Sequence, residues 1–76
     1  MTLEHKQNAI AYVRADIDML SEQTDDSERR AFHHRALAGL CAIRAGGLVT
    51  DKEFEMIGEQ IGAANEKASR QVRARH

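Results

Sequence analysis

Hydrophobic residues recur with the three-and-four spacing of amphipathic α-helices, in three segments separated by polar or glycine-containing breaks. The first segment covers residues 3–23 and places its apolar residues at heptad spacing: Leu3, Ile10, Val13, Ile17 and Leu20. Lys6 takes the remaining heptad position and interrupts this seam, and Thr2 is the expected N-cap. The pattern predicts one helix with a single apolar face.

The second segment covers residues 26–45 and contains the longest apolar run of the chain. Asp25 is the expected N-cap, because its carboxylate can accept a hydrogen bond from the backbone N–H of Glu28, three residues on. Residues 36–43 are apolar on every side, so we expect this helix to be the central, buried one. We also expect Cys41 to be buried there and unreactive, as thiols in apolar surroundings are.

The third segment covers residues 51–74, and its apolar stripe consists of Phe54, Ile57, Ile61, Ala64, Ala68 and Val72. Gly58 and Gly62 interrupt this helix, and each costs up to ~1 kcal/mol relative to alanine. We interpret the strip that they form with Ala63 as a place of close helix–helix approach. The approach is either inside the bundle or across a dimer interface.

The joint between the second and third segments carries the clearest local signals. Thr50 and Glu53 have the spacing of a capping box, in which each side chain accepts a hydrogen bond from the other residue's backbone N–H. Val49 and Phe54 have the spacing of a hydrophobic staple that closes over this cap. The pair Gly46-Gly47 supplies the left-handed residue that ends the preceding helix. These signals predict a well-defined helical hairpin with no reactive group at its joint.

The length of 76 residues fits one domain, and such a chain buries only about 60% of its unfolded surface. We predict a single all-α domain over residues 1–76, either a small three-helix bundle or a helical hairpin completed by dimerisation. The lone cysteine excludes an internal disulfide, and no apolar run reaches the roughly 18 residues of a membrane span. The N-terminus lacks the apolar core of a secretory signal. We therefore expect a cytoplasmic protein.

Charged residues come in blocks along the chain. Residues 16–28 hold six acidic residues and no basic one, whereas residues 67–76 hold only the basic Lys67, Arg70, Arg73 and Arg75. In an up–down–up bundle the C-terminal ends of the first and third helices lie side by side. We predict that the two blocks pair there, each exposed ion pair contributing less than ~1 kcal/mol. The alternative is two solvated faces that never touch.

The residues able to carry chemistry are few and poorly spaced. His33 and His34 lack the i, i+4 spacing of helical metal ligands, and Cys41 lies about 10 Å along the helix axis from His34. No serine sits in a nucleophile elbow, and no glycine-rich loop follows a strand to hold phosphate. We expect no metal, no cofactor and no catalytic residue, so the chain is not expected to be an enzyme.

Two surfaces are candidates for binding. Tyr12 and Met19 lie seven residues apart on the first helix, off the main seam, as a second apolar ridge that is either partly buried or in contact with another chain. Lys67, Arg70 and Arg73 recur at three-residue spacing, which is typical of a stripe that contacts phosphates or another anion. The net charge of −1 and the three acids in the first turn and a half of the third helix argue against nucleic acid.

The joint also resembles a known family. The run Gly-Leu-Val-Thr-Asp-Lys-Glu-Phe-Glu at 47–55, preceded by Leu37, Leu40 and Ile43, is similar to the short helical SHOCT-type module, whose signature is a Gly-hydrophobic-hydrophobic-Thr run leading into Glu-Phe. The similarity covers residues 37–59. Beyond it, Gly58, Gln60, Gly62 and Ala63 stand where the family has a lysine and closing leucines. The resemblance implies oligomerisation or protein binding and brings no catalytic residues.

These features predict a small non-catalytic protein-binding module that acts as a regulator, adaptor or inhibitor. We expect it to bind a second copy of itself and another protein through helix faces, with no membrane and no small-molecule substrate. Arginine outnumbers lysine eight to three, which is typical of a GC-rich bacterial or phage genome, so a phage- or mobile-element-encoded protein that binds a host factor fits. The alternative is a DNA-associated transcriptional regulator that uses the C-terminal basic stripe.

Overall fold

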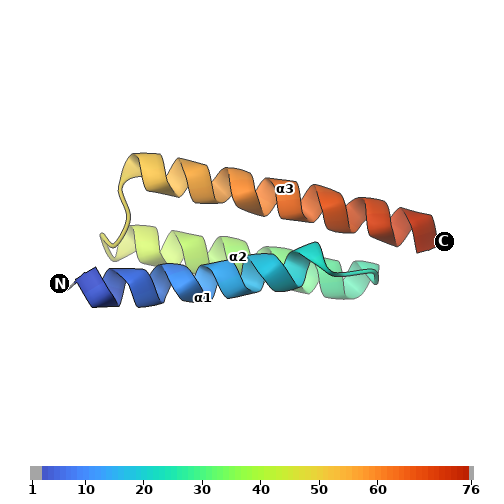
Figure 1. The fold of residues 1–76 in the computed structure, drawn as a ribbon, viewed down its shortest axis with the longest axis horizontal. Coiled ribbons are helices and arrows are strands. Elements are labelled where there is room, and N and C mark those ends of the chain that lie inside the picture. The colour runs from blue at the N-terminus through green and yellow to red at the C-terminus, as the bar shows by residue number, and fades with distance from the viewer. Residues whose placement is uncertain (1–2, 76) are drawn as a thin grey trace.

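Three helices run up, down and up to form an elongated bundle (Figure 1). The computed structural model describes residues 3–75. The helices are α1 (Leu3–Ser21), α2 (Asp26–Ala45) and α3 (Asp51–Arg75), and the described residues include no strand. The predicted all-α class is confirmed as a three-helix bundle. Helix α1 ends two residues earlier than predicted, because Glu22 and Gln23 donate to the carbonyls of Met19 and Leu20 in a turn, and α3 ends one residue later.

The core is built from one face of each helix, and each helix packs on both of the others. The most deeply buried large side chains are Leu20, Leu40, Ile57 and Ile61. The remaining buried residues lie on the predicted stripes of the first and third helices, on one face of α2 and in the loop before α3: Val13, Ile17, Ala36, Ile43, Val49, Ala64, Ala68 and Val72.

Helix α2 is amphipathic, so the prediction that it is buried on every side is wrong. Ala36, Leu40 and Ile43 face the core, but Leu37 is 40% exposed and Cys41 is exposed. In a three-helix bundle each helix contacts only two neighbours, which leaves an outward arc in solvent. Alanine-rich turns can occupy that arc at little cost, since apolar residues on the surface are common. The expectation of a buried, inert Cys41 is wrong for the same reason.

The N-terminal part of α1 is attached to the bundle by an ion pair as well as by partly buried apolar residues. Leu3 is exposed and Ile10 packs only partly against the core, so the heptad seam is incomplete at this end. Lys6, which interrupts the seam, donates a hydrogen bond from Nζ to Oε1 of Glu53 at 2.7 Å. This ion pair joins α1 to the first turn of α3. The predicted N-cap Thr2 lies outside the described residues.

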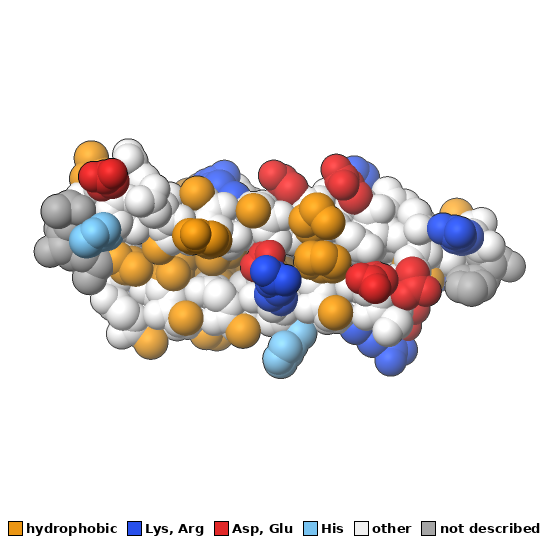
Figure 2. All heavy atoms as spheres, turned by 90° about the horizontal axis from the view of Figure 1, so that it is seen from below, with side chains coloured by type: hydrophobic (Ala, Val, Ile, Leu, Met, Phe, Trp, Pro, Cys, Tyr) orange, Lys and Arg blue, Asp and Glu red, His pale blue; other side chains and the backbone are white. Residues whose placement is uncertain are grey.

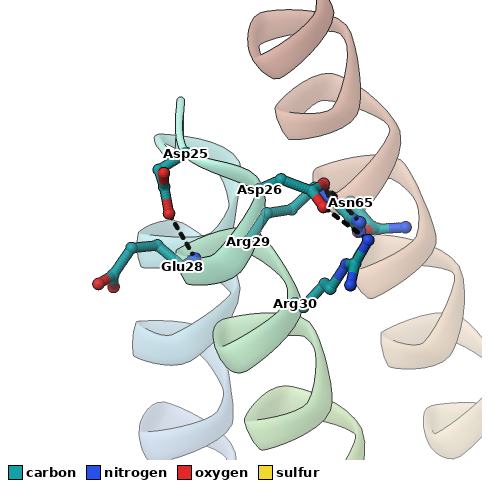
Figure 3. A network of polar contacts seen from close by, with 6 residues as sticks. All are labelled: Asp25, Asp26, Glu28, Arg29, Arg30 and Asn65. Carbon is teal, nitrogen blue, oxygen red and sulfur yellow. Dashed lines mark hydrogen bonds and ion pairs between the residues drawn. The ribbon is translucent and has the colours of Figure 1, made fainter.

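Helix α2 begins at the predicted cap. Oδ2 of Asp25 accepts a hydrogen bond from the backbone N–H of Glu28 at 3.0 Å (Figure 3). The carboxylate of Glu28 points away from the cap in the same view, so the cap works in one direction only. The bond satisfies one of the N–H groups that a helix start leaves without a partner.

A charged network beside this cap ties α2 to α3 (Figure 3). Arg29 donates to Oδ1 of Asp26 through Nε and Nη2, at 3.1 and 3.0 Å, and to Oδ1 of Asn65 through Nη1 at 2.7 Å. Arg30 pairs with the other oxygen of Asp26 at 2.8 Å. The hydrogen bond from Arg29, followed by the charge of Arg30, holds the pKa of Asp26 below its ordinary value. The sequence alone did not identify Arg29 as a link between helices.

The turn after α2 has the geometry of a Schellman motif. Gly47 adopts a left-handed φ of 73°, while Gly46 remains right-handed as the C-cap. The N–H groups of Gly47 and Leu48 donate to the carbonyls of Arg44 and Ile43, at 3.0 and 2.9 Å. The prediction that this glycine pair ends the helix is confirmed, and Gly47 is the left-handed member.

Helix α3 begins with the predicted capping box. The N–H of Glu53 donates to Oγ1 of Thr50 at 3.1 Å, and the N–H of Thr50 donates to Oε1 of Glu53 at 2.9 Å. Val49 is buried and Phe54 packs against the core, which places both residues of the expected staple in the apolar cluster. Arg44 lies over the Phe54 ring, 5.7 Å from its centre, and connects the end of α2 to this start.

The C-terminal ends of α1 and α3 lie side by side as predicted, but hydrogen bonds rather than ion pairs join them. Gln71 donates from Nε2 to the carbonyls of Ser21 and Gln23, at 3.1 and 2.9 Å, and Arg75 donates to Oγ1 of Thr24 at 2.8 Å. Between residues 3 and 75 no ion pair links the acidic and basic blocks, so that prediction is wrong. Carbonyls left unbonded where α1 ends need donors, and α3 supplies them.

Candidate protein-binding face

Two contacts fix how α1 and α2 align. Oδ1 of Asp16 lies 3.2 Å from Nε of Arg35, and a Cβ built on Gly39 would lie 3.3 Å from Cγ2 of Val13. Because the helices are antiparallel, each step forward on α1 corresponds to a step back on α2. The side chain of Tyr12 therefore starts level with residues 39–40 and that of Met19 with residues 32–33.

Large apolar side chains project from α1 into solvent. Tyr12 is 78% exposed and Met19 is 45% exposed. Tyr12 lines a shallow, open depression together with Asn8, Ala11 and Ala15. The predicted second ridge is thus present, and partial burial inside the bundle does not account for Tyr12.

The adjoining side of α2 carries small residues instead. Ala31, Arg35, Ala38 and Ala42 recur at three-and-four spacing and are all exposed. The ion pair between Arg35 and α1 shows that this row lies next to α1. The sequence does not reveal this row, because the apolar run over residues 36–43 predicts a buried stretch. An arginine in line with the alanines is the signal that could have identified it as facing solvent.

Together these residues form one continuous surface, which we call the α1–α2 face: Tyr12, Ala15, Asp16, Met19, Ala31, Arg35, Ala38 and Ala42. Figure 2 views the bundle from the side opposite α3, and hydrophobic side chains gather there around a central basic and acidic pair. The two helices differ in charge. From Asp16 to its end, α1 has two acids and no base, whereas α2 from Arg29 onward has four arginines and no acid.

The basic stripe of α3 has an acid inside it. Lys67, Arg70 and Arg73 are exposed. A guanidinium nitrogen of each of the two arginines lies 3.9 Å from Oε1 of Glu66. A phosphate group bound there would face this carboxylate, which weakens the electrostatic attraction on which phosphate contacts depend.

The two glycines of α3 are not explained by close packing inside the bundle. A Cβ on Gly58 would lie 3.9 Å from Cδ2 of Leu40, an ordinary contact, and a Cβ on Gly62 would meet nothing within 4 Å. The close approach occurs at Gly39, which the sequence analysis did not single out. A contact of the exposed Gly62 with another chain stays a prediction.

The histidines and the cysteine do not assemble into a site. His33 is half-buried, and desolvation together with the charge of Arg29 lowers its pKa, which favours the neutral imidazole. His34 and Cys41 are exposed. Residues 3–75 contain no group of three or more His, Cys, Asp and Glu side chains placed to hold a metal ion. None of the helices in this part of the chain is long and apolar enough to cross a membrane.

Comparison with known proteins gives no relative. No protein-family model, curated protein or solved structure matches the chain. The resemblance of residues 37–59 to the SHOCT-type module therefore stays a prediction. What the protein does is inferred from its own surface, on which Tyr12 has the highest exposed fraction among the large hydrophobic side chains of the described residues.

Proposed function

We propose that the protein is a small non-catalytic protein-binding module and that its α1–α2 face contacts the partner. The exposure of Tyr12 carries the proposal. A tyrosine has a large amphipathic surface with only two side-chain torsions, so it loses little entropy when a partner covers it. Tyrosine is also among the residues most enriched at the energetic centres of interfaces.

The surroundings of Tyr12 have the anatomy of an interface. Met19, Ala11 and Ala15 extend the apolar area on either side of it. Polar and charged groups, including Asn8 and the ion pair of Asp16, border that area, as they do around apolar interface centres. A contiguous apolar patch on a small protein often marks an interaction site. Such a surface suits a regulator, adaptor or inhibitor. A phage-encoded protein that binds a host factor is one example of such a protein.

Site-specific photo-cross-linking in the native host tests the proposal. A photoreactive phenylalanine analogue at position 12 is expected to give covalent adducts with protein after irradiation. The same analogue at Glu59, an exposed position on α3, is the matched control and is expected to give few or none. Equal adducts from both positions, or none from position 12, would refute the proposed use of this face.

A further inference from the structure

The α1–α2 face carries large exposed side chains on one helix and short exposed side chains on the other, at the same levels. Tyr12 starts level with the stretch of α2 where the exposed residues Ala38 and Ala42 have short side chains. Met19 starts level with the stretch that contains Ala31. The face therefore presents both halves of a knob-into-hole contact without joining them, because the two rows lie side by side on adjacent helices.

One symmetry operation brings the large side chains of α1 in one copy onto the short side chains of α2 in another. A two-fold axis parallel to the helices turns a second copy face to face with the first and keeps every residue at its level along the axis. It also exchanges the helices, so that α1 of each copy lies on α2 of the other. Tyr12 then meets Ala38 and Ala42 of the second copy, and Met19 meets Ala31 of the second copy.

The charges favour the same arrangement. The pair of Asp16 and Arg35 lies at the border between the helices, so the two pairs of a dimer meet at the axis. With α1 on α2, each Asp16 lies next to an arginine of the other copy, and the four charges alternate. A two-fold axis across the helices would instead put α1 on α1 and α2 on α2, bringing like charges together, which is unfavourable.

We infer that the partner of the α1–α2 face is a second copy of this chain, bound about a two-fold axis parallel to the helices. The inference rests on the proposed function of this face and adds the identity and orientation of its partner. Complementary shape and complementary charge come from different residues and select the same arrangement. The dimer would be a six-helix assembly with four helices at its centre.

Solution mass tests whether the dimer forms. Light scattering of the purified chain from about 1 µM to about 1 mM should show a rise from 8.5 kDa to twice that value. Tyr12→Asp and Ala38→Arg should each weaken association at least tenfold. Ala74→Arg, at an exposed alanine of α3, is the matched control and should leave association unchanged. All three positions are exposed, so circular dichroism should report an intact fold.

Cysteine cross-linking tests the orientation in a Cys41→Ser background. Ala15 lies level with Ala36 of α2 and therefore close to the level of Ala38. A mixture of Ala15→Cys and Ala38→Cys chains should therefore form the mixed disulfide on mild oxidation. Ala15→Cys alone should not form a disulfide with itself, whereas it would do so if α1 packed on α1.

The outcomes separate this inference from the proposed function. A monomer at every concentration overturns the inference, while adducts of position 12 with other proteins would still support the protein-binding face. A dimer insensitive to Tyr12→Asp and Ala38→Arg overturns it too, because another surface would then associate. A dimer cross-linked through Ala15→Cys alone overturns the orientation. Concentration-dependent mass with the mixed disulfide supports the inference in full.

Discussion

A single carboxylate oxygen connects two elements at the start of α3. Oε1 of Glu53 accepts both the backbone N–H of Thr50 and the ammonium of Lys6. The capping box is local and could be predicted from sequence, but the ion pair to α1 depends on the tertiary fold. The hydrogen bond from Lys6 is the largest cause of the lowered pKa of Glu53, and the bonds from Thr50 add to it.

This carboxylate makes stability depend on acid. The pKa of Glu53 falls from 4.5 to about 2, so its contribution to the free energy of unfolding is complete above pH 4.5 and is lost as the pH falls towards about 2. Glu53→Gln should lower the melting temperature at neutral pH and flatten its dependence on pH within that window. Thermal unfolding followed by circular dichroism measures both effects. Glu59→Gln is the exposed control, and an equal flattening in both variants would contradict the assignment.

At the scale of the helix, glycines have opposite roles at an end and in an interior. Gly47 ends α2 with a positive φ of 73°, a conformation that side chains with a Cβ rarely adopt. Gly62 lies inside α3, with open space where a Cβ would be. The first is required by the turn between the helices, and the second leaves α3 less stable than an alanine would.

Two matched substitutions follow from this contrast. Gly47→Ala should destabilise the protein by about 1–2 kcal/mol, because alanine is strained in the left-handed region. Gly62→Ala should stabilise it by up to ~1 kcal/mol through helix propensity. Urea unfolding monitored at 222 nm gives both free energies. Effects of the same sign would show that one of the two backbone environments is misassigned.

At the scale of the whole molecule, the distribution of charge argues against nucleic acid as the partner. The net charge is −1, and Glu66 lies inside the basic stripe of Arg70 and Arg73. A negative charge at the contact repels phosphate and reduces the release of counterions that drives such binding.

Fluorescence anisotropy with a labelled DNA duplex tests this expectation. We expect a dissociation constant weaker than about 10⁻⁴ M at physiological salt, outside the usual non-specific range. The double variant Arg70→Glu/Arg73→Glu should then bind no differently from the natural chain, and Glu66→Gln should tighten binding slightly. Tight binding that weakens with salt and disappears in the double variant would instead support the regulator that uses this stripe.

The local features of this molecule could be predicted from its sequence, and its surface could not. Helix bounds, the capping box and the glycine turn depend on residues within a few positions of one another. Whether Cys41 is exposed, and whether Arg35 can pair with Asp16, depends on which arc of α2 the other helices cover. Hydrophobicity alone does not specify that arc, because Ala38 and Ala42 are apolar whether covered or not. The close approach of Val13 to Gly39 is a tertiary contact, so the sequence around Gly39 does not predict it.

Because the number of antiparallel helices is odd, the two ends of the chain lie at opposite ends of the bundle. Leu3 and Arg75 lie at opposite ends of a body about 46 Å long (Figure 1). A circular permutant would need a linker of at least about 13 residues to span that length. In the proposed dimer both copies point the same way, so domains fused to the N-termini would gather at one end and domains fused to the C-termini at the other. The length of the bundle would then keep the two pairs of fused domains apart.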